Sequence, residues 1–87
     1  MKHGFMSKLL SSDQIIKTLL NRGFQLVSQR GSHQKYHKEG FTVIVPSPRK
    51  EIPMGTFRSI VRQAGLSVND FFEKNKINEY LIREFVS

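Results

Sequence analysis

The sequence predicts a small α+β domain of the order α-β-β-β-α, with a three-stranded antiparallel sheet and two helices packed on one face of it. Two segments, residues 11–23 and 53–65, carry apolar residues at helical spacing and end at a glycine. Between them, residues 25–45 alternate apolar and polar side chains and are interrupted twice by glycine. The chain of 87 residues is long enough for one hydrophobic core.

The first helix is predicted to begin at Ser11. Residues 11–14 (SSDQ) have the spacing of a capping box, in which the serine hydroxyl accepts a hydrogen bond from a first-turn amide and the glutamine returns to the serine amide. One apolar stripe follows, formed by Ile15, Ile16, Leu19 and Leu20. Gly23 is placed to end the helix in a left-handed conformation, and Phe24 is predicted to enter the core.

Three strands are predicted at residues 25–30, 32–38 and 41–45, joined by tight turns. Side chains alternate between the two faces of a strand, so His33, Lys35 and His37 share one face of the middle strand. Tyr36 is suited to the core and points to the opposite face, so His33 is predicted to face solvent. Residues 46–50 include two prolines, which lack an amide donor, and are therefore predicted to form an exposed basic connection.

The second main helix is predicted to follow Pro53, which suits a first helical turn. Its apolar stripe consists of Phe57, Ile60, Val61 and Ala64, with two arginines, Arg58 and Arg62, on the opposite face. A further capping signal at residues 67–70 predicts a short helix through Phe72. We therefore divide the chain into an N-terminal extension (1–10), one domain (11–75) and a C-terminal helical extension packed on that domain (76–87).

Composition and charge point to a polyanionic partner. Fourteen Lys and Arg residues against seven Asp and Glu give a net charge of +7, and residues 1–66 hold eleven of the basic but only three of the acidic residues. The absence of cysteine excludes disulfides, thiolate zinc sites and cysteine nucleophiles. No stretch has the length and hydropathy of a signal peptide or a membrane span, so we expect a cytoplasmic protein that does not bind membranes.

His33 is the first candidate for chemistry. On a regular strand, His33 and His37 lie about 13 Å apart, too far to share one metal ion or one phosphate. We therefore expect no metal and no cofactor, and at most one catalytic histidine. His33 follows the turn at Gly31 and Ser32, where backbone amides can hold an anion, and imidazole titrates in the range suited to removing a proton from a ribose 2′-hydroxyl. The ordinary alternative for His33 is a solvated side chain.

Basic residues around His33 are candidates for binding RNA phosphates. Lys35 lies about 6.6 Å along the same face of the strand. Arg49 and Lys50 precede a helix whose N-terminal amides favour phosphate, and Arg58 can extend the basic track. For each cation, the alternative is a solvated surface residue. Ser32 has no acidic partner nearby in sequence and is a weak candidate for a nucleophile.

Several motifs resemble the HicA family of toxins from prokaryotic toxin-antitoxin pairs. They are Gly31-Ser32-His33, Val45-Pro46, residues 52–60 (IPMGTFRSI) and residues 63–67 (QAGLS). The resemblance covers about residues 11–72. It implies a fold like that of double-stranded-RNA-binding domains and a metal-independent endoribonuclease that cleaves mRNA and arrests growth. It also implies a HicB-type antitoxin that holds the toxin in a heteromeric complex.

In the family, the histidine of the Gly-Ser-His motif is catalytic, and this role falls on His33. Two positions depart from the family pattern: this chain has Ser28 where many relatives have a basic residue, and Ser47 where several have a histidine. If those basic groups assist the reaction, the chain is slower or uses Lys35 instead. The alternative functions are a non-catalytic double-stranded-RNA-binding module and, with less support from the charge, an adaptor that binds only protein.

Overall fold

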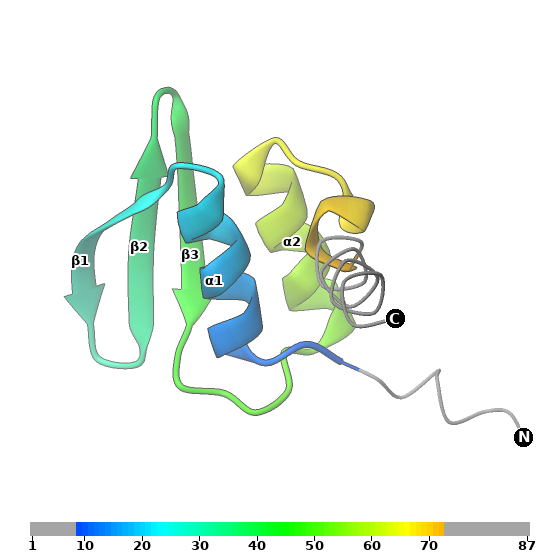
Figure 1. Cartoon of the computed structure of the whole chain (residues 1–87). Helices are drawn as coiled ribbons and strands as arrows, with labels where there is room; N and C mark the ends of the chain where they lie inside the picture. Colours follow the sequence, from blue (N-terminus) through cyan, green and yellow to red (C-terminus); the bar gives the residue numbers. More distant parts are fainter. Residues whose placement is uncertain (1–8, 73–87) are drawn as a thin grey trace, which may run out of the picture.

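The predicted order of helices and strands is confirmed by the computed structural model of the protein, which describes residues 9–72 (Figure 1). The elements are α1 (Ser12–Asn21), β1 (Gln25–Arg30), β2 (His33–Lys38), β3 (Phe41–Pro46) and α2 (Met54–Ala64). Residues 68–72 are helical, as the capping signal at 67–70 predicts. The predicted C-terminal extension (76–87) lies outside the described residues. None of the helices within residues 9–72 is long and apolar enough to cross a membrane.

The capping box at the start of α1 is confirmed. The backbone N–H of Gln14 donates to Ser11 Oγ at 3.1 Å, and the backbone N–H of Ser11 donates to the side-chain oxygen Oε1 of Gln14 at 2.9 Å. Ser12 connects the start of α1 to the segment before α2 by two hydrogen bonds. Its backbone N–H donates to the Arg49 carbonyl at 2.9 Å, and its Oγ accepts from the backbone N–H of Arg49 at 2.9 Å. These bonds fix the backbone of Arg49 relative to the helix.

The sheet is antiparallel in the order β1-β2-β3, so β1 and β3 are its edges. In the register, Arg30 pairs with His33 and His33 with Pro46, and an irregularity lies between Leu26 and Ser28. The strand β3 extends to Pro46, one residue beyond the predicted end. The prediction that Pro46 leaves the sheet is wrong because an edge strand tolerates proline, whose missing amide donor need not serve a neighbouring strand.

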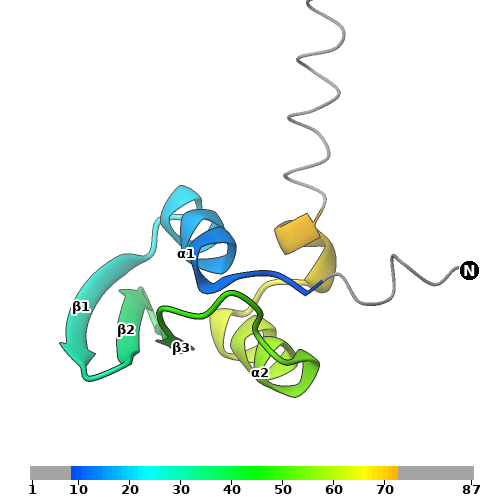
Figure 2. The same ribbon diagram turned by 90° about the horizontal axis from the view of Figure 1, so that it is seen from below.

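One face of the sheet is covered and the other is open within residues 9–72 (Figure 2). The helix α1 lies over the covered face, and α2 lies beside the outer edge of β3. Gln63 of α2 closes this edge: its Oε1 accepts the backbone N–H of Ile44 at 2.9 Å. An edge amide that would otherwise require water or a further strand is thereby satisfied.

The core lies between the covered face and the helices. Tyr36 is only 3% exposed, which confirms the predicted alternation of β2, and its hydroxyl donates to Gln34 Oε1 at 2.7 Å. Leu10, assigned from the sequence to the N-terminal extension, is buried in this core. The remaining buried apolar residues are Ile15, Leu19, Phe24, Val43, Val45, Ile52, Phe57, Ile60, Val61, Ala64 and Phe71.

The helical residues 68–72 are docked on both main helices. The ring of Phe57 on α2 meets Phe71 edge to face, with 5.4 Å between the ring centroids. Arg22 at the end of α1 donates to Asp70 Oδ1 at 2.8 Å. The Ser67 amide donates to Asp70 Oδ2 at 2.8 Å, and this bond, with the nearby Arg22, lowers the pKa of Asp70 below its ordinary value.

Gly65 ends α2 at φ 68°, and we expect Gly65→Ala to destabilise the protein more than Gly31→Ala. Both glycines have left-handed φ, so both variants lose about 1–2 kcal/mol from backbone strain. At Gly65 an added Cβ collides with the ring of Phe41, whereas at Gly31 no heavy atom of the described residues 9–72 lies within 4 Å of the added Cβ. Urea denaturation of the two variants measures the difference.

The control for this prediction is the double variant Gly65→Ala, Phe41→Ala. Without the Phe41 ring, Gly65→Ala should lower the unfolding free energy only as much as Gly31→Ala does. Equal losses from the two single variants would show that the Phe41 ring moves aside without cost.

Candidate active site

The open face of the sheet carries two of the predicted site residues, His33 and Lys35, both on β2. Directly opposite residues of antiparallel strands project to the same face. Arg30 of β1 and His33 of β2 form one such pair, and Lys35 pairs with Ser28 on β1 and with Ile44 on β3. His33, Lys35 and Arg30 are exposed, so the predicted outward orientation of His33 is confirmed.

Two hollows meet at His33. We name the first the strand hollow: it has a volume of about 350 Å³ and is lined by residues that include Ser28, Arg30, His33, Lys35 and Ile44. The second, the helix hollow, has a volume of about 450 Å³ and lies between β3 and α2. Its lining includes His33, Ile44, Arg49, Thr56, Ser59 and Gln63. His33 therefore stands between two depressions of a size typical for small ligands, roughly 300–1,000 Å³.

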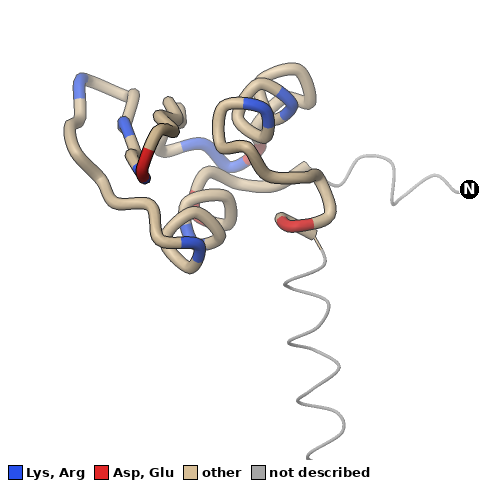
Figure 3. Tube along the Cα trace, turned by 90° about the horizontal axis from the view of Figure 1, so that it is seen from above, with Lys and Arg blue, Asp and Glu red and all other residues tan. Residues whose placement is uncertain are grey.

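Positive charge lies on both sides of His33. Arg30 and Lys35 line the strand hollow and Arg49 lines the helix hollow, and all three side chains are exposed. Lys and Arg positions are spread over the strands, the connection before α2 and the helices (Figure 3). A phosphate bound at His33 would thus have cations on either side, which is the arrangement that offsets the charge of a polyanion.

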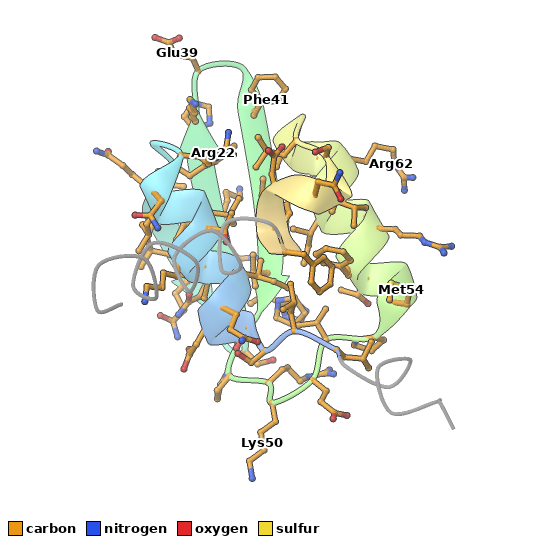
Figure 4. All side chains as sticks on the ribbon, turned by 45° about the vertical axis from the view of Figure 1, so that its right-hand side comes forward. Arg22, Glu39, Phe41, Lys50, Met54 and Arg62 are labelled. Carbon is orange, nitrogen blue, oxygen red and sulfur yellow. The ribbon has the colours of Figure 1, made fainter. Side chains whose placement is uncertain are left out.

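The other predicted RNA-binding residues are not part of the lining of either hollow. Gly31 and Ser32 form the turn between β1 and β2, and the Ser32 carbonyl accepts from the Ser47 amide at 2.8 Å. Lys50 is exposed on the connection before α2 and points away from the domain (Figure 4). Arg58 is exposed on α2. These four residues line neither the strand hollow nor the helix hollow.

His37 and Tyr36 are separate from the two hollows. Nδ1 of His37 lies 3.2 Å from Thr42 Oγ1, at the other end of β2 from His33. Burial, together with the nearby Asp13 carboxylate, raises the pKa of Tyr36, whose side chain points to the core. Tyr36 is therefore not placed to give a proton to a substrate at His33.

Two sets of residues at the site were not predicted from the sequence. The first is Arg30, which the two-residue turn between β1 and β2 places opposite His33. A turn was predicted here, and the register of a two-residue hairpin would have indicated this pairing. The second is the polar stripe of α2, Thr56, Ser59 and Gln63, whose helical spacing is visible in the sequence. That this stripe lies beside His33 depends on where α2 packs, which the spacing does not determine.

Within residues 9–72, no three His, Cys, Asp or Glu side chains gather closely enough to hold one metal ion. The site consists instead of one imidazole, basic side chains, hydroxyls and an amide.

Comparison with known proteins identifies the family. The family model described as "HicA toxin of bacterial toxin-antitoxin" matches residues 12–66, more than half of the chain. A comparison with curated proteins finds no match. The matched segment runs from α1 through α2 and contains His33 and all the lining residues named for both hollows. The chain therefore belongs to the HicA family of toxins of bacterial toxin-antitoxin pairs.

Proposed function

We propose that this toxin is an endoribonuclease that cleaves mRNA without a metal ion, with His33 as the general base. The observation that carries the proposal is the position of His33: it is exposed on the open face, between two hollows and among basic side chains. Family membership supports the role as a toxin. The chemistry of an imidazole beside cations supports the cleavage of RNA.

The proposed reaction uses the 2′-hydroxyl of the substrate. The imidazole of His33 removes the 2′-hydroxyl proton, and the 2′ oxygen attacks the adjacent phosphorus. The bond from phosphorus to the 5′ oxygen breaks, and a proton from His33 or from water returns to the leaving oxygen. The products are a 2′,3′-cyclic phosphate and a free 5′-hydroxyl, so protons and atoms balance without a redox partner.

Basic side chains supply the electrostatic stabilisation in this proposal. Negative charge grows on the phosphate oxygens as the 2′ oxygen attacks, and cations fixed near those oxygens stabilise the transition state more than the substrate. Lys35 and Arg30 on one side of His33 and Arg49 on the other are placed for this. Lys50, Arg58, Gly31 and Ser32 lie outside the hollows and are proposed as further contacts to the RNA.

The toxin is expected to cleave a labelled mRNA fragment equally fast in EDTA and in magnesium, because side chains rather than an ion bear the phosphate charge. Gel analysis of the fragments over time measures both rates. Cleavage that stops in EDTA and returns with magnesium would contradict the proposal. RNA binding with no cleavage under any condition would favour the alternative, a non-catalytic module for double-stranded RNA.

The antitoxin partner is proposed to be of the HicB type and to cover His33. Because the toxin carries a net charge of +7, a partner that is acidic at the contact is captured by electrostatic steering and competes with RNA for the same surface. The two proteins would then form an inactive heteromeric complex. A cytoplasmic location, where mRNA and ribosomes are found, is part of the same proposal.

A further inference from the structure

The polar stripe of α2 has no part in the reaction proposed above. Thr56, Ser59 and Gln63 recur at helical spacing of three and four residues, so they share one face of α2. This face differs from the buried apolar stripe. All three residues line the helix hollow together with His33 and Arg49.

The hydrogen bonds of this stripe use the Ser59 hydroxyl as an acceptor. Gln63 Oε1 accepts from the Ile44 amide at 2.9 Å, and Gln63 Nε2 donates to Ser59 Oγ at 3.1 Å. A serine hydroxyl that accepts one hydrogen bond retains its own hydrogen as a donor. Gln63 thus fixes Ser59 relative to β3, while the Ser59 hydroxyl remains able to donate to an acceptor in the hollow.

The lining of the helix hollow suits one nucleotide of an RNA strand. It combines the aliphatic Ile44 and Pro46 with the hydroxyls of Thr56 and Ser59 and the cation of Arg49, and no acidic side chain among residues 9–72 lines it. Aliphatic surface can contact a sugar or base, and hydroxyls and a guanidinium bind phosphate and ribose oxygens. Because His33 is also part of this lining, a nucleotide here is adjacent to the phosphate that reacts.

We propose that the helix hollow binds a nucleotide next to the cleaved bond, with Ser59, Thr56 and Arg49 as donors to its phosphate and ribose. Gln63 is a positioning residue that holds Ser59. The RNA then crosses the strands from β1 to α2 through His33, with its neighbouring nucleotide over the strand hollow. This inference rests on the proposed function and adds a binding site to it.

The direct test removes the two hydroxyls with little change in shape, in the double variant Thr56→Val, Ser59→Ala. We expect kcat/KM for RNA to fall at least tenfold and the preferred cleavage positions to change, because contacts to the nucleotide beside the cleaved bond are lost. The matched control is Thr42→Val, which removes a hydroxyl from β3 that lies outside both hollows. A double variant that cleaves within twofold of the control, at the same positions, would overturn the inference.

A binding measurement separates this inference from the proposed function. In the His33→Ala background, a short oligoribonucleotide is titrated while backbone amide signals are followed by NMR, with thermal melting as the check that each variant is folded. We expect the signals of Gly55, Thr56 and Ser59 to shift, and to shift less when the two hydroxyls are removed. RNA that shifts residues of the strand hollow but not these three would show that the helix hollow binds no nucleotide. A wild-type protein that never cleaves RNA would instead contradict the proposed function, and the titration would still decide whether the hollow binds RNA.

Discussion

Replacing His33 by alanine is expected to lower the rate of RNA cleavage by about 10²–10⁴-fold, the usual contribution of a general base. The side chain is exposed on the open face, so its removal leaves no cavity in the core and should not affect folding. RNA affinity should change little, because Arg30, Lys35 and Arg49 remain. Single-turnover cleavage and filter binding measure the two quantities.

The matched control is His37→Ala. His37 lies on the same face of the same strand, but it is paired with Thr42 and lines neither hollow. The His37→Ala variant should cleave within about threefold of the wild-type rate, because the imidazole of His37 takes no part in the proposed reaction. Wild-type cleavage by His33→Ala, or an equal loss in both variants, would contradict the role given to His33.

Phe57→Ala is expected to have the largest effect on stability, about 3–5 kcal/mol of unfolding free energy. Phe57 is 3% exposed, and its ring packs edge to face against both Phe71 and Phe72. The variant therefore loses buried apolar surface and also the contact that docks residues 68–72 on α2. This loss is a large fraction of the total stability of a small domain, which is about 5–15 kcal/mol.

Phe41→Ala is the control for this prediction. Phe41 is 42% exposed, so the same truncation should cost much less, about 1 kcal/mol. Denaturant unfolding followed by circular dichroism compares the two variants. Similar losses at Phe57 and Phe41 would show that the helical residues 68–72 do not depend on the Phe57 ring.

Features governed by local physics were predicted well from the sequence. The capping box at Ser11, the end of α2 at Gly65 and the burial of Tyr36 each follow from neighbouring residues: a donor pattern, a helix-ending glycine and the alternation of a strand. The outward orientation of His33 follows from the same alternation. For this reason the central candidate could be recognised before the structure was known.

Packing between elements was predicted only coarsely, as two helices on one face of the sheet. Nothing local to α2 shows that it lies beside the outer edge of β3, where Gln63 satisfies the Ile44 amide. That packing creates the helix hollow and brings Thr56 and Ser59 to His33. The strand position of Pro46 was not predicted for a related reason: proline is tolerated at this position only because β3 is an edge strand.

The most direct test of the proposed reaction is the chemical identity of the ends that the wild-type toxin produces from a defined RNA in EDTA. Attack by the 2′ oxygen predicts fragments that end in a 2′,3′-cyclic phosphate, or the monophosphate formed by its hydrolysis, and partner fragments that begin with a 5′-hydroxyl. Mass spectrometry distinguishes these ends. Fragments with a 3′-hydroxyl and a 5′-phosphate would contradict the account, because water rather than the 2′ oxygen would then have attacked the phosphorus.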